Sequence, residues 1–338
     1  MTDWTPGNRT TAMRTVFVRA PKALMTVAIC TVLLVVLASN SAQAQFLGHN
    51  FHGDYGLQSA TQPPPGFWLA AFYLRYDGDR LRDRNGDEVR IDPEGRGELD
   101  TNSYVLGLWW VSKTKILGAI YSLAVFSAFT DNVLEAPILD LEQKTDTGFT
   151  DLYIQPINLG WHTERADYTA GLGVYAPTGR YDPEASDNLG LGMWSFELFG
   201  GATVYFDQQK SWHFAAMAFY ETHTEKKDTD ITVGDILTLE GGLGKSFKEG
   251  MISAGLAYYA QWKVTDDDLG SELPGDRRLG KHRVYGLGPE LTLPIATNKR
   301  LIGFVNLRYF WEFGARTTLE GNTFTFTLNF PIPSISLG

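Results

Sequence analysis

Three short stretches contain residues whose types and spacing could bind an ion or a phosphate. HNFHGD, at residues 49–54, places two histidines near an aspartate, a set that could hold a metal ion. DRNGDE, at 83–88, resembles the start of a calcium-binding loop but lacks the downstream glutamate pattern. Gly244 to Ser246 resemble the end of a phosphate-binding loop whose first glycine is replaced by Leu239. We therefore expect a solvated segment, a turn and a strand, respectively, and no metal, nucleotide or other cofactor.

Hydrolysis of lipid would need a nucleophile within hydrogen-bond reach of a base. His162, His213 and His282 are the candidate bases, because each is associated with an expected strand. None lies in a recognisable nucleophile motif, and the one cysteine, Cys30, lies in a predicted leader. We predict that the protein is not an enzyme. A barrel enzyme that acts on lipid is the alternative.

The first 44 residues have the pattern of a signal peptide. Basic residues precede an apolar run at 23–38, and Ala42 to Ala44 supply the small-x-small motif of a cleavage site. The run has 16 residues, whereas a membrane-spanning helix needs about 20. We predict cleavage after Ala44, with translation starting at Met1 or at Met13. The alternative is a retained anchor helix.

The predicted mature chain, residues 45–338, is acidic. Removing the four basic residues and one acidic residue of the leader leaves 25 Lys and Arg against 38 Asp and Glu, a net charge of −13. Nonspecific binding to nucleic acid depends on neutralising phosphates with Lys and Arg. This balance of charge therefore argues against nucleic acid as a partner.

Alternation with a period of two residues dominates the mature chain and predicts β-strands. In LGMWSFELFGGATVYF, at 191–206, bulky apolar residues such as Trp194 and Leu198 alternate with residues such as Ser195 and Glu197. Collecting all such stretches gives twelve expected strands, at 67–76, 102–111, 115–127, 149–161, 167–176, 191–206, 211–221, 235–246, 251–262, 283–294, 300–313 and 322–330.

The connections between these strands favour a membrane barrel over a secreted β-sandwich. They run 25, 3, 21, 5, 14, 4, 13, 4, 20, 5 and 8 residues, so long and short connections alternate. Outer-membrane barrels combine short periplasmic turns with long external loops, and they close because lipid cannot satisfy an open sheet edge. We predict an all-β fold, a transmembrane antiparallel up-and-down β-barrel of about 12 strands in the bacterial outer membrane. The barrel would span residues 67–330, with a C-terminal tail at 331–338.

Strand parity predicts which side chains face the lumen. If Trp194 and its alternate neighbours face lipid, the intervening charged residues face inward, because Lys or Arg on the lipid face near the midplane destabilises a barrel by about 2–4 kcal/mol. The inward residues would form either a permeation surface or a network that packs the lumen. They are Glu197, Tyr205, Glu221, Glu240, Tyr259, Glu290, Asn306, Arg308 and Glu312. The expected aromatic girdles comprise Trp68, Tyr76, Trp109, Trp161, Trp194, Trp212, Trp262 and Trp311.

Three segments resemble, in order, an outer-membrane transporter family associated with the phenol meta-cleavage degradation pathway. They are GDYGLQSATQPPPG at 53–66, DLYIQPINLGWH at 151–162 and VYAPTGRYDPEA at 174–185. The resemblance spans nearly the whole mature chain and implies a β-barrel that transports apolar or aromatic compounds. One departure concerns the C-terminus. Outer-membrane barrels commonly end on an aromatic residue read by the barrel-assembly machinery, whereas Phe330 is followed by a further eight residues.

Residues 45–66 precede the first strand and finish in a stiff run of prolines. We hypothesise that part of this segment folds into the barrel mouth as a plug or gate, and the alternative is an ordered leader in the periplasm. The plug residues would be Gly53, Asp54, Tyr55, Gln58, Gln62, Pro63, Pro64 and Pro65. The expected function is passive uptake of small apolar or aromatic solutes through an outer-membrane channel. Outer-membrane lipid, lipopolysaccharide and the barrel-assembly machinery are the expected partners, and a structural or adhesive barrel is a further alternative.

Overall fold

The computed structural model describes residues 47–89, 98–136, 141–185, 187–248, 250–270, 281–298 and 300–333, without the side chains of 134–136 and 141–143. The predicted signal peptide and residues 334–338 lie outside these ranges. Within them, no helix is long and apolar enough to cross a membrane. The strands are β1 (Gly66–Arg82), β2 (Glu98–Ile116), β3 (Ala119–Ala136), β4 (Leu141–Phe149), β5 (Leu152–His162), β6 (Ala166–Ala176), β7 (Ser195–Tyr205), β8 (Trp212–His223), β9 (Ile236–Phe247), β10 (Ile252–Lys263), β11 (Arg283–Ala296), β12 (Leu301–Arg316) and β13 (Thr318–Ile332).

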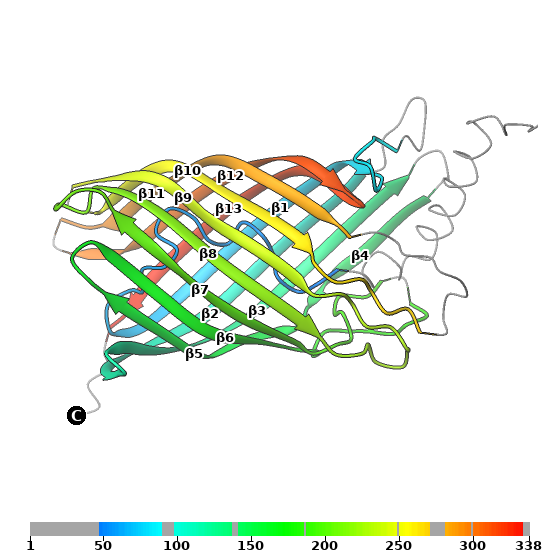
Figure 1. The fold of residues 1–338 in the computed structure, drawn as a ribbon, viewed down its shortest axis with the longest axis horizontal. Helices are drawn as coiled ribbons and strands as arrows, with labels where there is room; N and C mark the ends of the chain where they lie inside the picture. The colour runs from blue at the N-terminus through cyan, green and yellow to red at the C-terminus, as the bar shows by residue number, and fades with distance from the viewer. Residues whose placement is uncertain are drawn as a thin grey trace, which may run out of the picture.

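The strands form one closed antiparallel barrel (Figure 1). The first and last strands, β1 and β13, close the cylinder in a register that runs from Phe67 opposite Ile332 to Arg82 opposite Thr318. β4 and β5 share one position in the wall, because the C-terminal half of β3 pairs with β4 and its N-terminal half pairs with β5. The thirteen strands therefore occupy twelve positions, and the predicted twelve-position barrel is confirmed.

Three of the predicted long connections are wrong in extent. The sequence predicts loops at 77–101 and 128–148, but strands β1 to β4 extend into both ranges. The predicted loop at 314–321 is also wrong, because only Thr317 separates β12 from β13. Charged residues in these extensions pair across strands, as Arg82 does with Glu320 at 2.7 Å. Alternation of apolar and polar residues misses such strand ends because both faces of the sheet can be polar beyond the apolar band.

The two ends of the barrel carry connections of different length. At one end the strands are joined by tight turns at 117–118, 163–165, 206–211, 248–251 and 297–300. At the other end the connections 177–194, 224–235 and 264–282 are longer, although Thr317 alone joins β12 to β13 there. The barrel chain begins and ends among the tight turns (Figure 1). By the polarity of outer-membrane barrels, that end is periplasmic and the end with the long connections is external.

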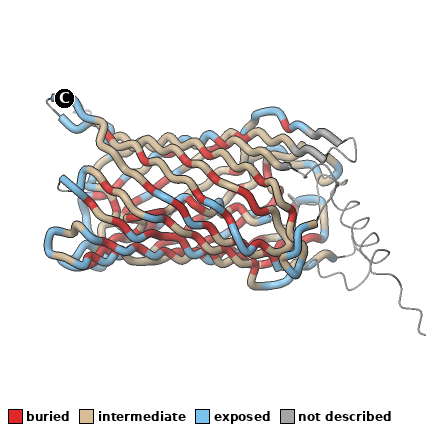
Figure 2. The backbone as a smooth tube through the Cα atoms, turned by 90° about the horizontal axis from the view of Figure 1, so that it is seen from above, coloured by how far each residue is buried: buried red, intermediate tan, exposed pale blue. Residues whose placement is uncertain are grey.

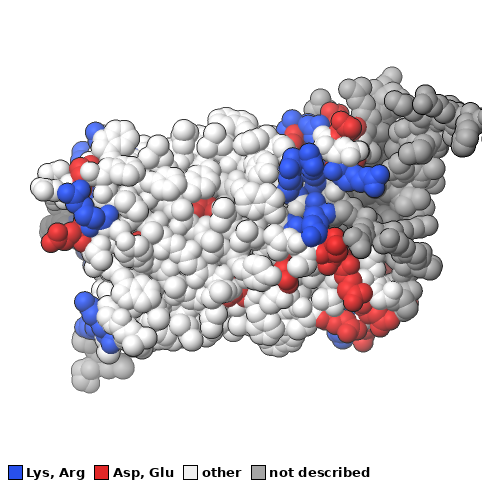
Figure 3. All heavy atoms as spheres, in the orientation of Figure 1, with Lys and Arg blue, Asp and Glu red and all other residues white. Residues whose placement is uncertain are grey.

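The outer surface is apolar and the interior is polar. Leu198 is 61% exposed, whereas its neighbour Glu197 is 2% exposed. β8 alternates between exposed and buried positions along nearly its whole length, and Figure 2 shows the same alternation in other strands. The face drawn in Figure 3 has a broad band with few charged side chains between two charged ends. A closed sheet with this exterior satisfies its backbone in lipid, and the protein is an outer-membrane barrel.

Three predicted members of the aromatic girdles, Trp68, Tyr76 and Trp109, point inward instead. On β1, Phe67 and Leu69 are exposed on the outer face, and Trp68 between them lies directly opposite Trp109 in the register. On β2, Leu108 and Trp110 are exposed on the outer face, so Trp109 faces the interior and lines a cavity there. On β1, the Tyr76 hydroxyl donates to the inward carboxylate of Glu312 at 3.0 Å. Proximity to a strand end predicts an interfacial aromatic residue only when the strand parity also places it outside.

Candidate functional site: a segment inside the barrel

Residues 47–65, which we call the luminal segment, run through the interior of the barrel (Figure 1). His49 contacts Ser195, at the external end of β7, whereas Gln62 contacts Ser122, near the periplasmic start of β3. The segment therefore descends along the lumen before the chain turns into β1. The turn occurs at Gly66, whose φ of 145° is one that glycine adopts without strain.

Three carboxylates of the inner wall hold the backbone of the luminal segment. A chain that pairs with no strand leaves its N–H groups without acceptors, and buried N–H groups need them. Carboxylate oxygens are strong acceptors for such groups. The N–H groups accepted at 2.7 to 3.0 Å are those of His49 and Asn50 by Glu221, of Gly53 and Tyr55 by Glu240, and of Leu57 by Glu290.

Arg308 holds the same backbone from its carbonyl side. Its Nη1 donates to the carbonyl oxygens of Gly53 at 3.1 Å and Asp54 at 2.7 Å. Its Nε lies 3.0 Å from Glu290 Oε2, and Asn306 donates to the other oxygen of Glu290 at 2.7 Å. The wall thus binds donors and acceptors of the main chain, so the contact depends little on which side chains the segment carries.

The remaining predicted lumen residues contact side chains of the luminal segment or support those that do. The structure places all nine of them on the inner wall, but it leaves their role in permeation a prediction. The contacts are Glu197 with Asn50 at 2.6 Å, Glu312 with His52 at 3.1 Å, Tyr205 with Thr61 at 3.1 Å, and the Tyr259 hydroxyl with Glu312 at 2.6 Å.

The predicted plug residues lie at different depths. Gly53 is buried, and Tyr55 packs against Phe219 with ring centroids 4.8 Å apart. Asp54 is exposed, although its carbonyl oxygen binds Arg308. Nearer the periplasm, Gln58 donates to Ser246 at 3.3 Å and Gln62 to Asn158 at 2.9 Å, whereas Pro64 and Pro65 are exposed.

The expectation of a solvated segment at 49–54 is wrong for His49. Its side chain is 7% exposed, and its two ring nitrogens lie 2.7 Å from Ser195 Oγ and 2.8 Å from Asp151 Oδ2. These partners are 146 and 102 residues away in the chain. No local pattern in the sequence could predict contacts over such separations, so the sequence reasoning missed them.

Ser195, His49 and Asp151 have the composition of a hydrolytic triad, but the cluster is closed. Ser195 is 0% exposed, so its hydroxyl cannot meet a substrate in this conformation. Asp151 also accepts the N–H groups of Gly179 at 2.9 Å and Leu191 at 2.7 Å, both in the β6–β7 connection. The cluster therefore ties the luminal segment to an external connection.

The three histidines that the sequence offers as catalytic bases have hydrogen-bond or ion-pair partners other than one another and other than the residues of this cluster. His162 pairs with Asp167 at 3.1 Å beside a periplasmic turn. The nearest hydrogen-bond partners of His213 and His282 are the Ser211 carbonyl and the Gln261 amide, rather than a hydroxyl nucleophile. No group of three His, Cys, Asp or Glu side chains that could hold a metal occurs in the described part of the chain.

Glycines of β9 and β10 make room for Leu57, which is 1% exposed. A Cβ atom built on Gly242, Gly244 or Gly255 would lie 2.8 Å from Leu57 Cδ2, closer than carbon atoms pack. The absence of side chains at these positions therefore sets how closely the luminal segment approaches the wall. Gly244 thus lies in strand β9, as predicted, and it has a packing role rather than one in phosphate binding.

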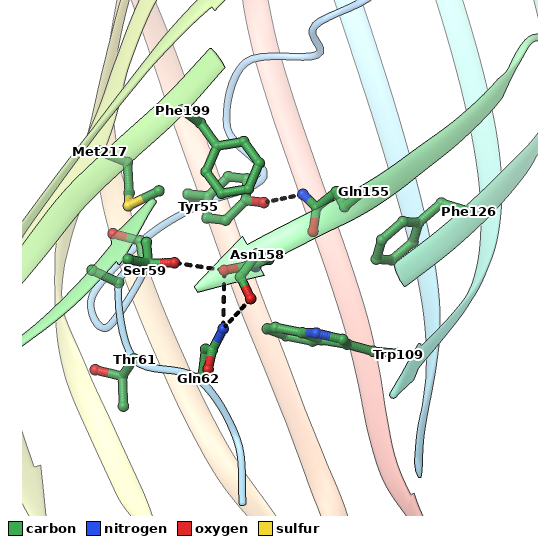
Figure 4. Close-up of a pocket in the computed structure, with 12 residues that line it drawn as sticks. Tyr55, Ser59, Thr61, Gln62, Trp109, Phe126, Gln155, Asn158, Phe199 and Met217 are labelled. Atoms are coloured by element: carbon green, nitrogen blue, oxygen red, sulfur yellow. Dashed lines mark hydrogen bonds between the residues drawn. The ribbon is translucent and has the colours of Figure 1, made fainter. Parts of the chain in front are cut away.

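A cavity of about 60 Å³ remains beside the periplasmic half of the luminal segment (Figure 4). The segment contributes Tyr55 and 59–62 to its lining, and the wall contributes Trp109, Phe126, Gln155, Asn158, Thr169, Phe199 and Met217. An engineered cavity of about 150 Å³ accepts benzene. A single aromatic ring therefore does not fit in this cavity while the segment stays in this position.

Residues 78–328 match the sequence model of a family described as "Putative MetA-pathway of phenol degradation". The chain belongs to this family. The resemblance seen in the sequence is thereby confirmed. The match begins within β1, so it covers most of the barrel wall and leaves the luminal segment outside.

Several solved structures are similar to the chain. An outer membrane channel from Pseudomonas putida F1 is 14% identical, with a TM-score of 0.67 over 84% of this chain and 100% of that chain. The transport unit of the autotransporter AIDA-I from Escherichia coli is 12% identical, with a TM-score of 0.45 over 89% and 98% of the two chains. At 14% identity, the likeness to the Pseudomonas putida channel shows a shared barrel fold. No curated protein matches the chain.

Proposed function

We propose that the barrel is a passive channel for small apolar or aromatic solutes and that the luminal segment is its gate. The proposal rests on the observation that, among the described residues, the luminal segment occupies the lumen of the barrel. The segment is held by hydrogen bonds and by Arg308, and these contacts can break and re-form. Membership of a family described by phenol degradation supports an aromatic cargo.

Movement of the luminal segment would uncover a path lined by aromatic side chains. Phe199, Tyr205, Phe219 and Tyr259 are buried on the inner wall, and their rings offer apolar area to an aromatic solute. Solute would then move down its own gradient. With cleavage after Ala44, only two residues would precede the segment.

The alternatives receive less support. A barrel enzyme that acts on lipid would need an accessible nucleophile, and Ser195, which lies beside His49, is fully buried. An adhesive barrel would need free external connections. Those at 177–194 and 224–235 instead bind each other, with Lys226 Nζ donating to the Leu191 carbonyl at 2.6 Å.

Removing residues 46–62 tests the proposal. We expect liposomes that contain the deleted protein to show higher conductance and faster uptake of phenolic compounds than liposomes that contain the full chain. Sugars and amino acids serve as polar comparison solutes, and a lipase assay on the same samples tests the enzymatic alternative. Unchanged conductance would show that the segment is not a gate. Exclusion of aromatic solutes by both proteins would show that the barrel is not a channel for them.

We also propose outer-membrane lipid and lipopolysaccharide as partners of the apolar exterior, and the barrel-assembly machinery as a partner during insertion. β13 continues through Phe330 to Ile332, so an aromatic side chain lies two residues from the end of the last strand. Substituting Phe330 with Ala should slow insertion into membranes that contain the assembly machinery. Insertion at an unchanged rate would place the signal elsewhere.

A further inference from the structure

Two arginines lie directly opposite each other at the external rim of the barrel. Arg283 is the first residue of β11 and Arg316 the last residue of β12, and the two are paired in the register of these strands. Like charges placed opposite each other destabilise a sheet. A counter-charge at this place would offset that repulsion.

The chain itself does not supply the counter-charge within its described residues. Arg283 donates through Nε to the carbonyl of Gly314 at 3.2 Å, and Arg316 Nε is buried with no hydrogen-bond partner. Four other arginines toward the external end differ, because each of them lies within 3.3 Å of a carboxylate. These pairs are Arg75 with Asp77, Arg80 with Asp79, Arg82 with Glu320 and Arg180 with Asp187.

The arginine pair lies beside an aromatic cluster on the outer face. Trp262 of β10 is opposite Arg283 in the register, and the Arg283 guanidinium is 5.6 Å from the centroid of the Tyr285 ring. Tyr285 in turn packs against Phe313 of β12, with centroids 5.8 Å apart. Aromatic residues of membrane proteins gather at the level of the lipid headgroups. The Arg283 guanidinium therefore lies at the level where the phosphates of the outer leaflet are found, and Arg316 is opposite it in the register.

Apolar side chains continue from this cluster toward the middle of the barrel. Leu287, Trp311 and Phe313 are 44%, 55% and 51% exposed on the outer face. Figure 3 shows Lys and Arg side chains gathered at the external edge of the uncharged band. A ligand that fits this surface has an anionic head at the rim and acyl chains along the band.

We propose that Arg283 and Arg316 together bind a phosphate group of lipopolysaccharide in the outer leaflet. The planar guanidinium donates two parallel hydrogen bonds to phosphate oxygens. A phosphate bound between the two arginines would attract both guanidinium groups and so offset the repulsion between them. The acyl chains of the same molecule would lie against Phe313 and Trp311. This site lies on the outside of the barrel, so it does not depend on the proposed gate.

Binding of fluorescent lipopolysaccharide to the purified barrel in detergent tests the proposal. Replacing both residues, Arg283→Gln with Arg316→Gln, should weaken binding about tenfold to a hundredfold, since two charge-assisted contacts are lost. The control variant Arg180→Gln removes an arginine that already pairs with Asp187, and it should bind as the wild type does. A heat-modifiability gel confirms that each variant is folded.

The chemical source of the phosphate is tested in the same assay. Dephosphorylated lipopolysaccharide should bind the wild type as weakly as the phosphorylated form binds the double variant. Wild-type affinity in the folded double variant would overturn the proposal. Displacement of the labelled lipid by millimolar inorganic phosphate would also overturn it, because the site would then recognise a free anion rather than a lipid.

Discussion

The two halves of the inner wall contact the luminal segment in different ways. β8, β9, β11 and β12, which we call the gripping half, bind its backbone through carboxylates and Arg308. β2 and β3, the uncharged half, present Trp109, Ser122 and Phe126 to the interior, and Trp109 and Phe126 line the cavity. In the channel that we propose, the first half would set how tightly the gate is held, and the second would border the route that a solute takes.

Weakening the gripping half should have the largest effect. Replacing Glu240→Gln and Glu290→Gln weakens the acceptors of three N–H groups and deprives Arg308 of its salt bridge. A buried charge that loses its partner is strongly destabilising. We expect about a tenfold or larger rise in conductance in planar bilayers. The exposed Glu184→Gln is the matched control, and a double variant that conducts no more than this control would show that the grip does not close the channel.

Crowding the gripping half should have a smaller effect. In Gly244→Val, the new side chain would overlap Leu57, and overpacking of this kind destabilises a packed contact by about 1–3 kcal/mol. Uptake of phenolic solutes by liposomes should rise severalfold. Combining it with Leu57→Ala makes room for the valine, so uptake should fall back toward the wild-type rate. Equal uptake by the single and the combined variant would disprove a steric cause.

Enlarging the uncharged half should change solute flux but not the hold on the segment. Trp109→Ala widens the cavity next to Phe126, and we expect a modest rise in aromatic uptake with unchanged hydrogen-exchange protection of residues 47–62. Faster exchange in this variant would show that the two halves do not act separately.

The smallest effect should come from pH, through the external connections above the gripping half. Burial lowers the pKa of Lys226 to about 7, against an upward influence from Asp151. The value in the unfolded chain is near 10.5, so the folded connections bind fewer protons between these values and gain stability as pH rises from about 7. Exchange in 224–235, corrected for the intrinsic rate, should be slower at pH 9 than at pH 6. Lys226→Met should remove this difference in exchange rate. If the difference persists in the variant, another titratable group causes it.

The barrel and the inward residues were predictable because both follow from local rules. Alternation along β7 and β8 fixes which side of the wall Glu197 and Glu221 occupy, since only one face meets lipid. β4 was not predictable in the same way, because LEQKTDTGF is polar on both faces and carries no alternation signal.

The candidate site was harder to predict than the wall that surrounds it. The segment binds through backbone groups, which every residue carries, so its sequence holds no signature of its partners. His49 illustrates this, because Asp151 and Ser195 become its neighbours only after the barrel has closed. Strand parity predicts which side chains of the wall face the lumen. The sequence of the segment does not predict which of these side chains it contacts.

A reversible cross-link between the segment and the wall tests the gate most directly. The Ala60 N–H donates to Thr203 Oγ1 at 3.2 Å, and the only natural cysteine, Cys30, lies in the predicted leader. A disulfide in Ala60→Cys with Thr203→Cys would hold the segment beside the cavity. We expect uptake of phenolic solutes to fall to the level of empty liposomes after oxidation and to recover after reduction. Equal uptake by the verified cross-linked and reduced forms would contradict the account.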